Sequence, residues 1–170
     1  MSAIMMPPLS LAQIRISAAR LREILGVPLD AYFDIVKIID NLPEIFGAVV
    51  EVVPKNELGD KHGETYPVVK KIRIREDIYD RACEGRGRDR LTLAHELAHL
   101  ILHGPSKIAL ARVEENTHVP AYRDAEWQAN AFAGELLAPY RFIRDMTEEE
   151  IQCKYGVSAM AAKIQKNRRG

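Results

Sequence analysis

The sequence has few of the features that mark secreted, membrane-spanning or strongly charged proteins. Only 2 of its 170 residues are cysteine, and Cys83 and Cys153 lie far apart, which excludes a disulfide scaffold and favours free thiols in a reducing compartment. No apolar run approaches the roughly 20 residues that a bilayer-spanning helix needs. Residues 1–15 lack the basic and then apolar order of a signal peptide. These absences predict a cytoplasmic protein with no membrane partner.

The sequence also lacks net charge. It has 24 Lys and Arg residues against 24 Asp and Glu residues, so nothing in the composition favours long-range attraction to nucleic acid. Apolar residues make up 47% of the chain and charged residues 28%, which is ordinary for a globular domain long enough to bury a core. We therefore expect one domain whose partner is a protein or peptide, with no direct binding of nucleic acid.

The most informative stretch is the apolar segment 91–104, which contains His-Glu-Leu-Ala-His at positions 95–99. Leucine and alanine surround the histidines on nearly every side, which predicts a buried helix. Gly104 followed by Pro105 is typical of a helix end. Two imidazoles inside such a helix need polar partners, because an unpaired buried polar group is costly.

The spacing of the two histidines suits a metal ion. Residues four apart lie on one face of a helix, so His95 and His99 can both reach one zinc ion. Glu96 lies beside that face, where a carboxylate can take the proton of a water molecule that attacks a carbonyl. The alternative is a pair of core histidines that are hydrogen-bonded to their neighbours.

A catalytic zinc site usually has three protein ligands, and the third must come from elsewhere. Pro105 stands where the metzincin pattern needs a histidine. His103 lies about 80° further round the helix than His95, and we expect it to face a neighbouring element instead of the metal. A second helix is predicted over 124–139, with Asp124 as its N-cap.

Glu126 lies in the first turn of this second helix, and Asn130 follows one turn later on the same face. Together with the two histidines this predicts a His, His, Glu site with an amide behind it. Two alternatives stay open. Glu126 can be an acidic residue that the helix dipole favours, and Glu135, near the other end of the helix and on another face, is the competing ligand.

The two motifs in this order resemble the ImmA/IrrE metallopeptidase family. In that family an H-E-x-x-H helix is followed by E-x-x-A-N-x-F-A and by a leucine-rich end that closes with proline. The matching segments here are 95–99, 126–133 and 136–139. Ala138 departs from the methionine that members often have, which affects packing and not chemistry. The resemblance covers the second half of the chain closely and the first half in outline.

The resemblance implies a gluzincin-like site that binds one zinc ion per chain, with His95, His99 and Glu126 as its ligands and Glu96 as the catalytic base. Hydrolysis also needs a donor for the negative charge that develops on the substrate oxygen. Tyr122 and His118, in the segment between the two metal helices, are our candidates, with a structural role as the alternative for each.

The expected fold is α+β, a mostly helical zincin-like metallopeptidase domain over 9–146. A flexible tail over 1–8 precedes it, and a C-terminal helical extension over 147–170 packs on the same domain as a hairpin. The strand patterns predict a small, mainly antiparallel three-stranded sheet, and the resemblance implies that it lies beside the H-E-x-x-H helix. Local patterns predict helices over 10–25 and 30–42, strands over 47–53, 65–69 and 71–75, and a charged, solvated loop over 76–90.

The expected function is zinc-dependent endopeptidase activity on one specific protein. In the family the usual substrate is a helix-turn-helix repressor, whose cleavage derepresses genes of mobile elements or stress responses. Too few residues precede the motif for a repressor domain, so we expect a separate repressor as partner. One alternative is a protein-binding, toxin–antitoxin-like regulatory module with a weakly active or structural metal site. Another is DNA contact through 149–165, which resemble a helix-turn-helix unit; a packed hairpin is favoured there.

Overall fold

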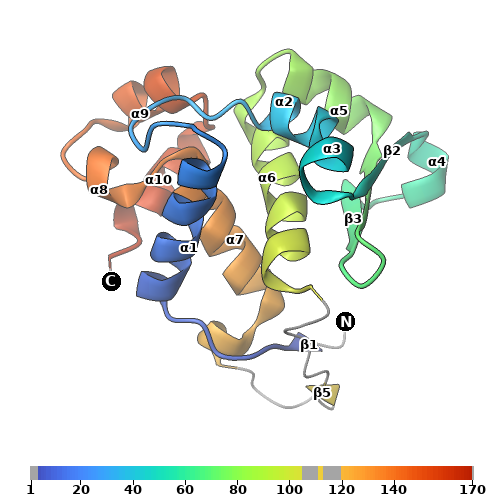
Figure 1. Cartoon of the computed structure of the whole chain (residues 1–170). Coiled ribbons are helices and arrows are strands. Elements are labelled where there is room, and N and C mark those ends of the chain that lie inside the picture. Colours follow the sequence, from blue (N-terminus) through green and yellow to red (C-terminus); the bar gives the residue numbers. More distant parts are fainter. Residues whose placement is uncertain (1–3, 105–110, 113–119, 170) are drawn as a thin grey trace.

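The computed structural model describes residues 4–104, 111–112 and 120–169. Two long helices, α6 (Gly87–Leu102) and α7 (Ala125–Leu137), lie side by side at its centre (Figure 1). Both predicted metal helices are therefore confirmed. Leu93 and Leu97 of α6 are fully buried, because elements pack against this helix on several sides. Asp124 accepts hydrogen bonds from the first backbone N–H groups of α7, as the sequence predicted.

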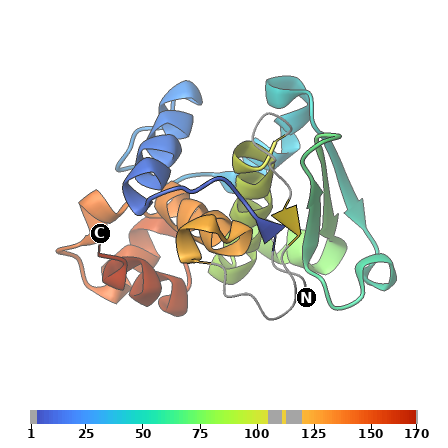
Figure 2. The same cartoon turned by 90° about the horizontal axis from the view of Figure 1, so that it is seen from below.

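A three-stranded sheet lies on one side of α6, while α7 lies on the other (Figure 2). Its strands are β2 (Val49–Val53), β3 (Gly63–Tyr66) and β4 (Lys71–Arg75), in the order β2-β4-β3. Strand β4 pairs with β2 in parallel and with β3 antiparallel, so the sheet is mixed and not mainly antiparallel. The connection through α4 (Lys55–Leu58) carries the chain past β4 to the far edge, and the β3–β4 turn then brings β4 back parallel to β2.

Strand β3 begins and ends two or three residues earlier than the strand predicted over 65–69. It stops before Pro67, which has no N–H to donate to a sheet. The carbonyl of Pro67 instead accepts from the backbone N–H of Lys70 in the turn that leads to β4. Among the described residues strand β3 pairs with β4 alone, so it lies at an edge of the sheet, as expected.

The charged segment over 76–90 is not the solvated loop that we predicted. It contains α5 (Glu76–Cys83) and the first turn of α6. Arg81 forms ion pairs with Asp77 and Asp89, so charges four residues apart on a helix support each other. Ile78 of the same helix is fully buried. The density of charges wrongly suggested a loop, because in the folded chain the charged side chains form ion pairs and the apolar side chains pack in the core.

The helix predicted over 30–42 is also corrected. The structure has two shorter helices there, α2 (Ile35–Asp40), capped by Asp34, and α3 (Leu42–Phe46). The residues just before α2 are not helical, and they place Phe33 in the core. Pro43 lies in the first turn of α3, where its missing N–H costs nothing. The apolar pattern correctly predicted helical structure. The helix begins later than predicted, and it is divided into two at Asn41.

The remaining helices cover the other side of α7. Helix α1 (Leu11–Ile24) packs on α7 and begins with a capping box between Ser10 and Gln13. Beyond α7 follow α8 (Tyr140–Ile143), α9 (Glu148–Tyr155) and α10 (Ala159–Asn167). Ile151, Tyr155 and Ala162 belong to the same hydrophobic core as α6 and α7. The C-terminal helices are therefore a packed hairpin, which is the interpretation that we favoured over DNA contact.

The segment before α1 is tied to the chain just before α7. Strand β1 (Ile4–Met5) pairs antiparallel with β5 (Ala111–Arg112). The backbone N–H groups of Met6 and Leu9 donate to the carbonyls of Arg123 and Tyr122, and Met6 is buried. From Ile4 onward, the flexible tail predicted over 1–8 is thus held by backbone hydrogen bonds.

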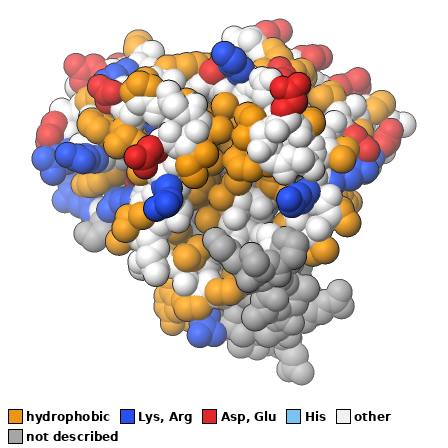
Figure 3. Space-filling view, in the orientation of Figure 1, with side chains coloured by type: hydrophobic (Ala, Val, Ile, Leu, Met, Phe, Trp, Pro, Cys, Tyr) orange, Lys and Arg blue, Asp and Glu red, His pale blue; other side chains and the backbone are white. Residues whose placement is uncertain are grey.

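The surface is mixed in character. On the face shown in Figure 3, hydrophobic side chains gather in the middle and charged side chains of both signs lie around them. Within the described ranges, none of the helices has the length and apolar character needed to cross a membrane.

Candidate metal centre

Three side chains from α6 and α7 converge at one point. His95 Nε2 lies 3.0 Å from His99 Nε2. The Glu126 carboxylate lies against both rings, with Oε2 at 3.2 Å from His95 Nε2 and Oε1 at 3.2 Å from His99 Nε2. The ligand atoms of these three residues all lie within 4.8 Å of one another. The structure therefore brings together the three residues that we predicted as zinc ligands.

The packing of α6 on α7 creates this arrangement. The cap at Asp124 starts α7 immediately before Glu126, so Glu126 lies in the first turn. Ala98 of α6 and Ala129 of α7 are fully buried, and such small side chains let two helices approach closely. The Glu126 side chain remains 68% exposed, so the centre opens to solvent on that side.

The chemistry of these donors fits a divalent cation. Two imidazole nitrogens and a carboxylate form a donor set that zinc prefers. When their rings are protonated, His95 and His99 donate hydrogen bonds to Glu126, and these bonds hold the pKa of its carboxyl group well below its usual range. Burial lowers the pKa of His95, but its contacts with the carboxylates of Glu126 and Glu96 outweigh burial and raise it. The centre thus stabilises a positive charge among its ligand atoms, and a metal ion supplies one.

Further polar groups contact the outer nitrogens of the two rings. Asn130 Oδ1 lies 2.9 Å from His95 Nδ1, in agreement with the amide that we predicted behind the site. His103 Nδ1 lies 2.9 Å from His99 Nδ1, and His103 Nε2 lies 3.0 Å from Gln128 Oε1 of α7. As expected, His103 faces a neighbouring element. Sequence reasoning missed Gln128; the available signal was one amide among the apolar positions of a buried helix.

Glu96 lies on the sheet side of the centre, in a confined space. It is 7% exposed, and Thr65 of β3 donates from Oγ1 to Glu96 Oε2 at 2.6 Å. A Cβ atom at Gly63 would lie 2.8 Å from Glu96 Cγ and 2.9 Å from Oε1. Burial raises the pKa of Glu96, and the bond from Thr65 opposes this effect. Neither Gly63 nor Thr65 stood out in the sequence, because only the packing of β3 on α6 gives them a role.

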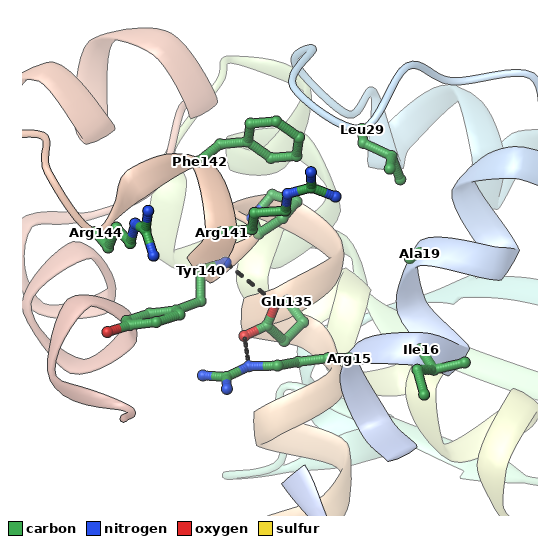
Figure 4. A pocket seen from close by; sticks show the side chains of 10 residues that line it. Arg15, Ile16, Ala19, Leu29, Glu135, Tyr140, Arg141, Phe142 and Arg144 are labelled. Atoms are coloured by element: carbon green, nitrogen blue, oxygen red, sulfur yellow. Dashed lines mark hydrogen bonds and ion pairs between the residues drawn. The ribbon is translucent and has the colours of Figure 1, made fainter. Parts of the chain in front are cut away.

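The other candidates from the sequence are Tyr122, His118 and Glu135. Tyr122 is in η2 (Ala121–Arg123), where its side chain is half exposed and its carbonyl accepts a bond from Gln128. His118 lies outside the described residues. Glu135, the competing ligand, is buried between α1, α8 and α10, where Arg15 Nε donates to it at 3.0 Å and the backbone N–H of Tyr140 at 3.2 Å (Figure 4). Its carboxylate is therefore not part of the metal centre.

Comparison with known proteins shows the family and the fold. The model of the peptidase M78 family, described as the IrrE N-terminal-like domain, matches residues 44–165. No curated protein matches the chain. A solved structure of a Mycobacterium tuberculosis transcriptional regulator shares the fold, with a TM-score of 0.61 and 16% identity over 93% of this chain. The alignment covers 48% of that regulator, so this chain spans about half its length. By its family match, this chain belongs to the metallopeptidase-like ImmA/IrrE family.

Proposed function

We propose that this chain is a zinc-dependent endopeptidase that cleaves a specific protein. The observation that carries the proposal is the buried Glu96 carboxylate beside a His95, His99 and Glu126 centre that is open to solvent. A purely structural zinc site usually has four ligands, often cysteines, and has no use for a base beside it. When bound, zinc supplies Lewis acidity toward a carbonyl and lowers the pKa of a water molecule to about 7.

Each residue of the centre has its own role in the proposed reaction. His95, His99 and Glu126 hold the metal. Glu96 takes the proton of the attacking water and passes it to the leaving amine. Thr65 holds one carboxylate oxygen, Oε2, by its hydroxyl group, and the missing side chain at Gly63 leaves room beside the other, Oε1. Tyr122 and His118 remain our candidates for the donor to the substrate oxygen.

The edge strand β3 supports a peptide as substrate. Its outer backbone groups have no partner strand among the described residues, and an extended peptide can bind there by adding a strand. The strand carries Thr65, which contacts Glu96, so a peptide aligned on β3 would run past the base. We propose as substrate a separate helix-turn-helix repressor, whose cleavage derepresses genes of mobile elements or stress responses. This step rests on the family resemblance.

New protein N-termini provide the direct test of this function. Zinc-loaded wild type and the Glu96→Gln variant would each be incubated with host extract that contains any repressor encoded nearby. We expect one cut in a repressor with wild type alone. If the two samples have the same N-termini while both proteins contain zinc, the proposed function is wrong and a protein-binding regulatory module takes its place.

Gly63→Ala should lower the rate of cleavage by about 10²-fold, because the new methyl group displaces the Glu96 carboxylate by about an ångström. The atoms that it meets belong to the Glu96 side chain, which can move, so we expect little change in the free energy of unfolding. Cleavage assays and zinc analysis would be made on the same preparation. An unchanged rate would show that the close contact between Gly63 and Glu96 is irrelevant to catalysis.

Glu126→Ala should remove most of the rise in melting temperature that zinc gives the protein. A ligand at 100 times its dissociation constant stabilises the folded state by about 2.7 kcal/mol. Glu149→Ala is the matched control, because Glu149 is also an exposed acidic residue in the first turn of a helix. If both variants respond to zinc like wild type, Glu126 only complements the helix dipole.

A further inference from the structure

We propose that Gln128 and His103 are positioning residues that select the tautomer of His99, so that His99 presents an unprotonated Nε2 to the metal. The inference rests on the proposed metal site. It follows from three hydrogen bonds whose donors and acceptors can be assigned in sequence, because the first of them ends on backbone carbonyls.

The side-chain amide of Gln128 has only one orientation that satisfies its surroundings. One of its terminal atoms lies 2.9 Å from the carbonyl oxygen of Pro7 and 2.8 Å from that of Tyr122. A carbonyl oxygen can only accept, so this atom must be the NH₂ group. The other atom, Oε1, therefore faces His103. The backbone of the N-terminal segment and that of η2 together determine which end of Gln128 points at the histidine.

The oxygen of Gln128 in turn determines the tautomer of His103. Oε1 lies 3.0 Å from His103 Nε2 and can only accept, so Nε2 carries the hydrogen. His103 is 4% exposed, and no carboxylate is among its hydrogen-bond partners in the described part of the chain. A buried, unpaired imidazolium is costly, so the ring is neutral. A neutral ring with hydrogen on Nε2 has a lone pair on Nδ1.

The lone pair of His103 determines the tautomer of His99. The two Nδ1 atoms lie 2.9 Å apart, so His99 must donate from Nδ1 to His103. In a neutral His99 ring, Nε2 is then left without hydrogen, and it faces His95 Nε2 and the Glu126 carboxylate. This is the state in which an imidazole binds a metal ion.

The two histidine ligands are thus oriented by different means. His95 donates from Nδ1 to Asn130 Oδ1 at 2.9 Å, in a single step from side chain to side chain. In the described part of the chain, His99 is linked to the backbone carbonyls of Pro7 and Tyr122 through His103 and Gln128. His103, at the end of the H-E-x-x-H helix, is therefore not a metal ligand. It determines which nitrogen of His99 carries no hydrogen.

Nitrogen-15 NMR of the metal-free wild type, with the histidine rings labelled and at a pH where they are neutral, tests the assignment directly. We expect hydrogen on Nε2 of His103 and on Nδ1 of His99. Hydrogen on Nε2 of His99 would overturn the inference even if the protein binds zinc and cleaves its substrate. The expected tautomers in a protein without peptidase activity would instead leave the inference intact and overturn the proposed function.

Gln128→Leu removes the acceptor to which His103 donates. It tests whether the hydrogen bonds from Gln128 to His103 and from His103 to His99 determine the tautomer of His99. We expect a mixture of tautomers at His99, an unchanged His95 ring and a fall in zinc affinity of about 10–100-fold. Gln165→Leu is the matched control, because Gln165 is equally buried but bonds to Glu135, away from the metal centre. Equal losses of affinity in both variants, or unaltered tautomers in Gln128→Leu, would overturn the inference.

Discussion

Replacing Glu96 by glutamine should lower the rate of peptide cleavage by about 10²–10⁴-fold, the range that a general base contributes. The variant removes the proton acceptor and little else. Glutamine has nearly the same shape, and its amide oxygen can still accept the hydrogen bond that Thr65 donates to Glu96 Oε2. His95, His99 and Glu126 are untouched, so zinc content should not change.

Single-turnover cleavage rates and zinc content, measured on the same samples, check this result. Thr65→Val is an informative companion, because it keeps the carboxylate but removes its hydroxyl partner. We expect it to be less impaired than Glu96→Gln. A fully active Glu96→Gln variant would mean that another group takes the proton. The roles proposed for Thr65 and Gly63 beside Glu96 would then be wrong too.

Replacing Arg90 by leucine should lower the free energy of unfolding by about 3–5 kcal/mol, because several charge-assisted hydrogen bonds are lost and buried carbonyls are left unpaired. Arg90 is 1% exposed. It donates to the carbonyls of Tyr155, at 2.9 Å, and Gly156 at the end of α9, and to that of Phe33 at 2.6 Å. One guanidinium thus joins α6 to the end of α9 and to the segment just before α2.

Urea unfolding would measure this effect, and for a chain of this size we expect the melting temperature to fall by about 10 °C. Arg88→Leu is the control, because Arg88 lies on the same helix but is exposed. It should change stability by no more than about 0.5 kcal/mol. Equal stability of the two variants would show that the carbonyls around Arg90 find other partners.

Several elements of the fold could be predicted because their causes are local. The caps at Ser10, Thr147 and Ser158 satisfy N–H groups within their own helices, and all three begin a helix in the structure. The alternation over 71–75 likewise predicted β4 correctly. The errors have different causes. Phe33 is buried in the core just before α2, so the helix begins later than its apolar pattern suggested. The charges over 76–90 include the ion pairs of Arg81 with Asp77 and Asp89, and their density was mistaken for that of a solvated loop.

The sequence by itself determined the local half of the metal centre. The spacing of His95 and His99 places both rings on one face of any helix, since side chains four apart superpose. It also determined that Glu126 would lie in a first turn, because Asp124 caps the helix before it. These are consequences of backbone geometry within one turn.

Only the tertiary structure decided which acidic residue faces the histidines and what supports them. Glu126 and Glu135 lie on the same helix, but the packing of α6 brings Glu126 to the rings, while Arg15 and Gln165 bind Glu135. Gly63 and Thr65 contact Glu96 because β3 lies next to α6. Gln128 contacts His103 because α7 packs against α6. The physical reason is that hydrogen bonds and close contacts between distant segments depend on how helices and strands pack, which no local periodicity encodes.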